Sequence, residues 1–256
     1  MTIRIERNGA VVQIVIDRPD KMNAMSPEMY EAFGDATLAL QKDTSVRAVL
    51  LRAEGKAFCT GSDVGNMTGF NVGVARLRLH RAQRVITGLA NLDKPVIAAV
   101  RGAAVGFGWS IAMACDLIIA SDNARFGQVF KKVGLAPDGA AAYFLTQAIG
   151  APRARELIMS GRIIDAAEAL ALGIINEVVP DGELEARALA LTEELAESAT
   201  FALAMGKRLV RGAAQPNLEA FLDLEAHIQN LVLQTDDHKE GAAAFREKRK
   251  PNFIGR

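Results

Sequence analysis

Residues 101–121 read RGAAVGFGWSIAMACDLIIAS, a glycine-rich turn set between two apolar runs. The first run, PVIAAV, ends just before this stretch, and the second, DLIIAS, closes it. Both runs are short and apolar, which is typical of buried strands. Between them, IAMA lies after Gly106 and Gly108 and predicts a short apolar helix. Two strands separated by a glycine turn and a helix indicate an α/β fold.

The same alternation continues toward the N-terminus. IRIE and AVVQIVID flank Asn8-Gly9, a dipeptide that suits a two-residue hairpin turn. Ser26 and Pro27 predict the start of a helix that ends near Lys42, because serine caps helices and proline fits the first helical position. The strand RAVLLRA, the loop EGKAFCTGSDVGNMTGFN and another helix follow. Apolar residues of that helix are Val74, Leu77, Val85, Ile86 and Leu89.

The chain after Asp138 is predicted to be mostly helical. Pro152 opens one helix, Asp165 can cap the next, and IINEVV forms a short strand. Further helices are expected over residues 183–199, 201–212, 218–233 and about 237–250. We therefore divide the chain into an α/β core over 1–180 and a helical region over 181–256.

The bulk composition excludes several classes of protein. The chain has 256 residues, and its 30 basic and 30 acidic side chains cancel, so no net field attracts nucleic acid or an anionic membrane. The two cysteines, Cys59 and Cys115, show no metal-ligand spacing and suggest a reducing compartment. No window reaches the ~18 apolar residues of a membrane span, and the N-terminus has no long apolar run. We expect a cytoplasmic protein without a metal site.

The segment GWSIA around Ser110 is close to the G-x-S-x-G turn of serine hydrolases. An activated serine requires a base that a third group orients. The three histidines, His80, His227 and His238, fall in predicted helices, and the strand PVIAAV ends well before Ser110. The sequence therefore argues against a serine nucleophile.

Gly106 and Gly108 leave other roles open for the same segment. G-x-G without a following lysine or third glycine is weak evidence for a phosphate-binding loop. Glycines before an apolar helix can, however, expose backbone N–H groups that stabilise an oxyanion. A second strand-to-loop segment, AFCTGSDV, could aim a further N–H at the same oxygen. On spacing alone, two plain tight turns explain these segments better.

The order of the motifs resembles the enoyl-CoA hydratase/isomerase family, also called the crotonase superfamily. The matching segments are RPDKMNAM, KAFCTGSDV, RGAAVGFGWSIAMACDLIIAS with ARFG, GLAPDG with YFLTQAIG, ALALGIINEVVP and AFREKRKPNF. The resemblance covers essentially the whole chain. It implies a crotonase-like spiral of ββα units with a helical C-terminal region, and an acyl-CoA thioester as substrate. Coenzyme A is then part of the substrate, and no separate cofactor is implied. The resemblance also implies a homotrimer or a dimer of trimers.

The resemblance implies an oxyanion hole made by the backbone N–H groups of Ser62 and Phe107. A main-chain donor at Phe107 does not require a particular side chain. Hydratases of this family carry two glutamates where this chain has Ser110 and Phe130, and neither residue can act as a general base near neutral pH. Asp138 resembles the single acidic base of several isomerases of the family, including the epoxyphenylacetyl-CoA type. A helix N-cap is the structural alternative for Asp138.

The other expected contacts follow from the same resemblance. Asp63 is expected to stabilise the turn beside the oxyanion hole, with Val64 next to it. Lys248 and Lys250 either reach CoA phosphates or belong to a solvated basic tail. The residues expected beside the adenine and ribose are Lys21, Met22, Ala24, Lys56 and Ala57. The side chains expected in an acyl pocket are Met67, Phe107, Trp109, Phe130 and Tyr143.

The sequence thus favours an enoyl-CoA double-bond isomerase that uses an oxyanion hole and one carboxylate. One alternative is an enoyl-CoA hydratase with a non-standard acid/base pair. A thioester hydrolase would be a third chemistry, for which no specific residue is found. A non-catalytic acyl-CoA-binding protein is the alternative from another class, because both family glutamates are missing.

Overall fold

The computed structural model describes residues 3–63, 65, 71–214 and 217–256. Within this part of the chain, six strands form the main sheet in the order β1-β2-β3-β4-β6-β9. β1 (Ile3–Asn8) and β2 (Val11–Ile16) form the expected antiparallel hairpin, and every other neighbouring pair in this sheet is parallel. The other strands are β3 (Ala48–Ala53), β4 (Val96–Val100), β6 (Leu117–Ser121) and β9 (Glu177–Val179). The α/β fold class is confirmed.

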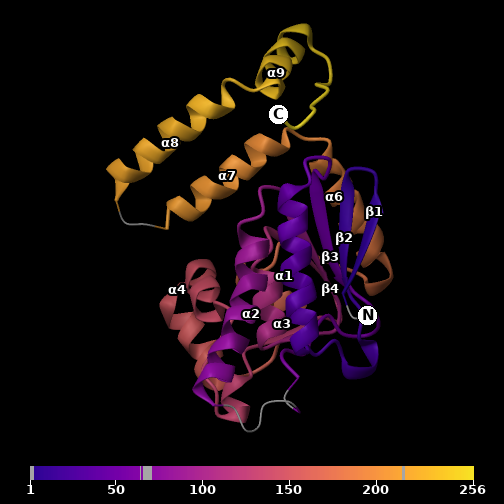
Figure 1. Ribbon diagram of the computed structural model, residues 1–256, viewed down its shortest axis with the longest axis vertical. Helices are drawn as coiled ribbons and strands as arrows, with labels where there is room; N and C mark the ends of the chain where they lie inside the picture. Colours follow the sequence, from indigo (N-terminus) through magenta and orange to yellow (C-terminus); the bar gives the residue numbers. More distant parts are fainter. Residues whose placement is uncertain (1–2, 64, 66–70, 215–216) are drawn as a thin grey trace.

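Two helices cover one face of this sheet, α1 (Pro27–Lys42) and α2 (Val72–Ala90) (Figure 1). The Ser26 hydroxyl accepts a hydrogen bond from Met29 N at 3.3 Å, which confirms the predicted cap of α1. On α2, Ala82 and the predicted Val85, Ile86 and Leu89 are buried, whereas Val74 and Leu77 are exposed. The C-terminal half of α2 therefore carries its contact with the core.

Helix α6 (Leu184–Ala196) covers the opposite face of the sheet. Its buried Leu184 and Ala188 pack against Leu50 of β3 and Ile97 of β4, while Val49 and Leu51 of β3 point to the α1 and α2 side. A strand exposes alternate side chains to opposite faces, so both layers share β3. The expected division at residue 181 follows the change to helical sequence, but α6 is packed as part of the core.

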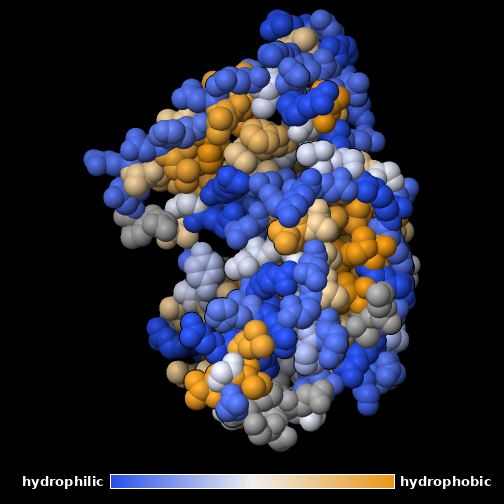
Figure 2. Space-filling view, in the orientation of Figure 1, coloured by the Kyte–Doolittle hydropathy of each residue, from blue (hydrophilic) through white to orange (hydrophobic). Residues whose placement is uncertain are grey.

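The helices that project from this core are α7 (Thr200–Gly212), α8 (Leu218–Val232) and α9 (Asp236–Glu247) (Figure 1). We call residues 200–247 the arm. Ala204, Met205 and Ile228 join α7 to α8, and Lys207 of α7 forms an ion pair with Asp116 at 2.8 Å. Hydrophobic side chains gather over α7 and α8 (Figure 2). Exposed large apolar residues of these helices include Leu203, Val210, Leu218, Leu222, Leu224 and Leu231.

A second sheet in the order β5-β7-β8 was not predicted. β5 (Ala103–Val105), β7 (Arg125–Gly127) and β8 (Ile164–Asp165) contain two or three residues each. Such short strands cannot show a period of two in sequence. Asp165 then caps α5 (Ala166–Ala171) as predicted, since its carboxylate accepts from Glu168 N at 2.8 Å.

Candidate active site

Two strand-to-loop segments run side by side where the parallel strands β3 and β4 end. The segment after β3 pairs with β5: Cys59 N donates to Ala103 O at 3.0 Å, and Val105 N donates to Cys59 O at 3.0 Å. Helix α3 (Phe107–Met113) begins directly after β5. A Cβ built on Gly108 would lie 2.1 Å from the Cys59 carbonyl oxygen. Because only glycine allows this approach, Gly108 fixes the start of α3 against the loop.

Ser62 and Phe107 present backbone N–H groups at this junction. A Cβ built on Gly61 would lie 3.5 Å from Phe107 N, so the two segments adjoin at these residues. Among the described residues, neither N–H donates to another backbone oxygen. The pairing with Met25 uses other atoms: Met25 N donates to Gly61 O, and Asp63 N donates to Met25 O. Two spare donors on adjoining segments can bind one oxygen that becomes negative in a reaction.

A cavity of about 110 Å³ lies beside these donors. Its wall includes Phe107, where α3 begins, and Phe130, at the start of the 3₁₀-helix η3 (Phe130–Val133). Both residues were predicted for an acyl pocket. The other lining residues are Thr60, Gly61, Ser62, Arg78, Gly106, Val129, Lys132, Val133 and Leu135. Apolar walls with a few convergent polar groups suit a small acyl group bound through its carbonyl oxygen.

Asp138 lies on the turn before α4 (Ala141–Ser160). The N-cap of α4 is Ala140, without a side-chain cap, so the alternative role of Asp138 as a capping residue is wrong. Its carboxylate is only 16% exposed, and Oδ2 lies 3.7 Å from Arg78 Nη2. Oδ1 is buried without a hydrogen-bond partner in the described part of the chain. Burial raises the pKa of the Asp138 carboxyl, and the positive charge of Arg78 opposes that rise.

The turn that carries Asp138 rests directly on α3. The Ser110 hydroxyl donates to the Asp138 backbone oxygen at 3.1 Å and also contacts Gly106 O at 3.4 Å. Gly139 has φ of 62°, and a Cβ there would lie 2.7 Å from Phe107 Cδ2 and 2.8 Å from Ser110 Cβ. Small residues at 110 and 139 therefore let the turn sit against the oxyanion segment.

The residues expected beside adenine and ribose form one connected unit. The Asn23 amide donates to Glu54 O at 2.8 Å and to Ala57 O at 2.7 Å, and its oxygen accepts from Arg18 N at 2.7 Å. Thr60 N donates to Met22 O at 3.2 Å. The structure therefore brings the segment with Lys21, Met22 and Ala24 next to the segment with Lys56 and Ala57.

Asp63 occupies the turn-stabilising position that we predicted. Its carboxylate accepts from Arg18 Nη1 at 2.9 Å and from Gly65 N at 3.1 Å. The Arg18 guanidinium also holds the pKa of the Asp63 carboxyl below its usual range. Arg18 thus joins the turn after β2 to the loop that carries Ser62. Val64 and Met67 lie outside the described residues.

Other predicted residues are not brought to this cavity. Trp109 is fully buried, with its ring 5.6 Å from that of Phe126. Tyr143 is half exposed on α4 beside Phe144. In the C-terminal segment, Lys248 ends α9, and Lys250 forms an exposed ion pair with Glu197 at 3.0 Å. A phosphate contact of Lys248 or Lys250 stays a prediction.

Two residues near the site were missed from the sequence, Arg78 and Tyr30. The Tyr30 hydroxyl lies 2.6 Å from Ser62 Oγ, and its ring packs edge-on against Phe107 at 5.0 Å. Arg78 donates from Nη2 to Ser62 Oγ at 3.1 Å. A signal for Arg78 was present: it precedes Ala82, Val85 and Leu89 at helical spacing, so it shares the buried face of α2.

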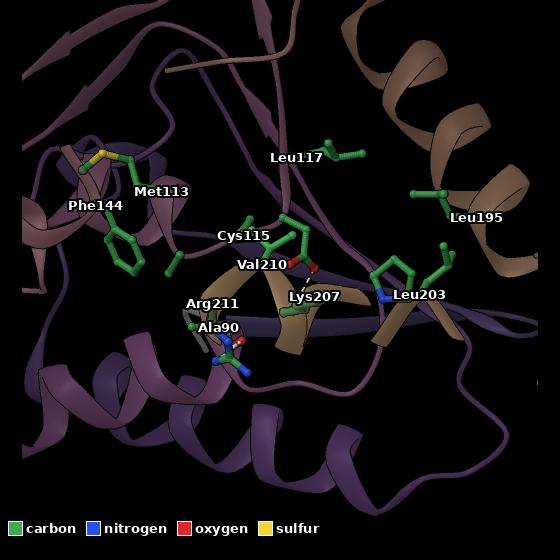
Figure 3. A pocket seen from close by; sticks show the side chains of 13 residues that line it. Ala90, Met113, Cys115, Leu117, Phe144, Leu195, Leu203, Lys207, Val210 and Arg211 are labelled. Carbon is green, nitrogen blue, oxygen red and sulfur yellow. Dashed lines mark hydrogen bonds and ion pairs between the residues drawn. The ribbon is translucent and has the colours of Figure 1, made fainter. Parts of the chain in front are cut away.

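A larger cavity of about 380 Å³ separates α7 from the core (Figure 3). Apolar side chains such as Met113, Phe144 and Leu203 line most of it, and the ion pair of Lys207 with Asp116 crosses it (Figure 3). It contains neither the candidate oxyanion donors nor Asp138, so its size does not make it the reaction site.

The described residues contain no cluster of His, Cys, Asp or Glu with the grouping of a metal site. None of the described helices combines the length and apolar character needed to cross a bilayer.

Comparison with known proteins places these features in context. The model of the family described as enoyl-CoA hydratase/isomerase matches residues 6–256. A probable enoyl-CoA hydratase of Rhodobacter capsulatus is 35% identical over 256 residues, covering 100% of this chain and 98% of the relative. The 1,2-epoxyphenylacetyl-CoA isomerase of Escherichia coli is 33% identical over 250 residues, with 96% and 95% covered.

Solved structures show the same architecture. The crystal structure of an enoyl-CoA hydratase from Bacillus anthracis matches this chain with a TM-score of 0.95 and 31% identity. The match covers 100% of both chains. The crotonase-like fold expected from the motifs, with its helical C-terminal region, is therefore confirmed.

Proposed function

Because this chain belongs to the enoyl-CoA hydratase/isomerase family, we propose that it moves a carbon–carbon double bond in an enoyl-CoA thioester. The chain is an acyl-CoA-processing enzyme of this family, and isomerisation is the reaction that its candidate site favours. The observation that carries the proposal is one carboxylate, that of Asp138, which is 16% exposed and lies on a turn packed against Phe107. By the resemblance to the family, Ser110 and Phe130 stand where hydratases carry their glutamates.

The proposed reaction begins with binding of the thioester oxygen by the N–H groups of Ser62 and Phe107. This polarises the carbonyl and makes a proton at Cα of a 3-enoyl group acidic. The Asp138 carboxylate takes that proton, and the electrons spread over a dienolate. The protonated Asp138 then returns the proton to Cγ, which gives the 2-enoyl thioester and restores the carboxylate. No water and no second acid enter this sequence.

The two altered positions support one-base chemistry. Hydration requires a group that activates water and a group that delivers a proton. The Ser110 hydroxyl already donates to the Asp138 backbone oxygen, and Phe130 contributes an apolar ring to the cavity. Asp138 is not itself part of the cavity wall, although its ion-pair partner Arg78 is. Asp138 would therefore reach the acyl group at the side of the cavity that Arg78 lines.

Hydration is the second candidate, and the names of the relatives favour it, since most are called hydratases. An assay of purified protein with matched 2-enoyl-CoA and 3-enoyl-CoA substrates separates the two reactions. Isomerisation without rapid hydration is the expected result. Rapid hydration alone contradicts the proposal, and binding without turnover of any thioester would favour an acyl-CoA-binding protein.

The variant Asp138→Asn tests the base directly, because the amide keeps the size of the side chain but accepts no proton. Removal of a general base typically lowers the rate ~10²–10⁴-fold. Asp122→Asn is the matched control, because Asp122 is an exposed aspartate outside the site. Full isomerase activity in Asp138→Asn would eliminate the assigned role.

We also propose that the chain assembles into a homotrimer or a dimer of trimers. The exposed apolar residues of the arm support this, because monomers rarely leave large apolar surfaces in water. The occupant that we expect on α7 and α8 is a second copy of this chain. Light scattering during size exclusion measures the mass directly, and a monomer at micromolar concentration would contradict assembly.

A further inference from the structure

Arg78 has an unusual environment for an arginine on a surface helix. It occupies the helical face of α2 that buries Ala82, Val85 and Leu89, and its side chain is only 21% exposed. The next arginine, Arg81, instead pairs with Glu31 of α1. Arg78 therefore points toward the candidate site, while Arg81 serves the contact between two helices.

One nitrogen of Arg78 contacts both halves of the site. Nη2 donates to Ser62 Oγ at 3.1 Å and lies 3.7 Å from Asp138 Oδ2. Ser62 Oγ is also 2.6 Å from the Tyr30 hydroxyl. The guanidinium therefore joins the residue that supplies a candidate oxyanion donor to the candidate base.

The charged and titratable groups around Asp138 come from several elements. Tyr30 of α1 and Cys59 of the loop after β3 both face this region, and burial raises the pKa of each, to about 12 for the Cys59 thiol. Both stay neutral near pH 7. Lys132 of η3 lines the neighbouring cavity. Among the described residues, Arg78 is the cation that forms an ion pair with Asp138.

The distance between Arg78 and Asp138 suits a carboxylate that has to accept a proton. A bidentate arginine would occupy the carboxylate oxygens with hydrogen bonds. At 3.7 Å, Arg78 supplies its charge without a close hydrogen bond, so both oxygens of Asp138 remain able to accept a proton. An uncompensated carboxylate at this depth would instead favour its protonated form.

We propose that Arg78 is a positioning residue, which keeps Asp138 an anion and ties it to the Ser62 loop. This inference rests on the proposed function, since it assigns Asp138 the role of base. Arg78 acts through Asp138 and Ser62 and does not exchange a proton with the substrate.

The test compares Arg78→Gln and Arg78→Lys with the control Arg81→Gln, which removes a charge from the same helix at a site away from Asp138. Two quantities are measured: kcat/KM against pH with a 3-enoyl-CoA, and the titration midpoint of the Asp138 carboxyl by ¹³C NMR. Loss of the signal in Asp138→Asn assigns the resonance. Because the ionised base is the active form, activity is lost as pH falls through that midpoint.

In Arg78→Gln, both midpoints should rise by about one pH unit or more, the usual effect of a close opposite charge on an aspartate. Below both midpoints this corresponds to a loss of about tenfold or more in kcat/KM. Arg78→Lys should be intermediate, because an ammonium keeps the charge but lacks the planar fork. Arg81→Gln should leave both midpoints unchanged.

An unchanged NMR midpoint in folded Arg78→Gln overturns the proposal, whatever happens to kcat. If Arg78→Gln does not fold, Arg78→Met keeps the apolar stem of the side chain and provides the same titration. The NMR measurement requires no turnover. It therefore decides the role of Arg78 even if the wild-type protein isomerises no enoyl-CoA, a result that would count against the proposed function alone.

Discussion

The oxyanion side and the base side of the candidate site are built from different parts of the chain. On the oxyanion side, the donors are backbone N–H groups, and contacts at Gly61 and Gly108 fix their segments. On the base side, one carboxylate is held by Arg78 and by the turn that rests on Ser110. A backbone donor persists when side chains change, whereas a base exists only with its residue. The first side is thus a property of the fold, and the second is a property of individual residues.

Among the variants that keep Asp138, the one that removes a backbone donor should have the largest effect. Ser62→Pro removes the N–H, while Gly61 O and Asp63 N, which pair with Met25, remain. Loss of one oxyanion donor typically lowers kcat ~10²–10³-fold. Ser62→Ala keeps the N–H and loses only the hydroxyl contacts, so its loss should be much smaller. Equal activity of the two variants in steady-state assays would contradict the backbone role.

Gly139→Ala tests how the two sides touch, and its effect should be smaller. The new methyl group would meet the Phe107 ring and Ser110 Cβ. Overpacking of this kind costs about 1–3 kcal/mol of the free energy of unfolding. The control is Gly134→Ala, because Gly134 also has a positive φ, of 70°, but open space around it.

Because the new methyl group displaces Asp138, kcat/KM of Gly139→Ala should be lower than that of Gly134→Ala by about tenfold or more. Thermal unfolding and kcat/KM are measured on both variants. Both variants carry the strain of a positive φ, so a difference between them reports the steric contact at Gly139. Similar values for the two variants would show that the close packing of this turn has no role.

Ser110→Ala should have a mild effect, because the hydroxyl supports the Asp138 turn and no chemical step. One hydrogen bond contributes about 1 kcal/mol net, so kcat should fall by roughly two- to tenfold. Complete loss of turnover in a folded Ser110→Ala protein, checked by circular dichroism, would return the serine to consideration as a nucleophile.

The smallest effect concerns stability. The pKa of Asp138 is raised in the folded state, so the native protein loses stability as pH rises from the ordinary value of 3.8 through the raised value. Asp138→Asn should therefore have a higher Tm than wild type at pH 7, and the difference should vanish below pH 3.8. A Tm at pH 7 below that of wild type would contradict the direction of the shift.

Sequence patterns predicted the N-terminal hairpin, the cap at Ser26 and the cap at Asp165, because these depend on local backbone chemistry. The turn of the hairpin is Gly9-Ala10 and not the expected Asn8-Gly9, because Asn8 pairs with Val11. The motifs also led to the segments of Ser62 and Phe107, which the structure brings together. The second sheet was missed because its strands are too short to show a pattern. The alternative role of Asp138 as a helix cap is wrong because the chain makes one more turn, through Gly139 and Ala140, before α4 begins.

The side chain of Phe107 has a structural role beside the proposed role of its backbone N–H. A main-chain donor does not need it, yet the ring is 1% exposed and packs against Tyr30. Truncation of a buried Phe costs about 3–5 kcal/mol, so Phe107→Gly would test folding as much as catalysis. Arg78 was missed because an arginine on a helix suggests a solvated face, although its spacing from the apolar residues of α2 pointed to the buried face.

The contact between Gly108 and the Cys59 carbonyl bears on how this protein can be redesigned. No side chain fits there, so the loop with Ser62 and the helix with Phe107 are held at a fixed spacing. A combinatorial library that varies positions 110, 130 and 138, and leaves residues 59–62 and 106–108 intact, would keep the proposed pair of oxyanion donors in every member. Selection for a new reaction then acts on proton transfer alone. The glycine contact thus separates the part of the enzyme that directed evolution should conserve from the part that it can exchange.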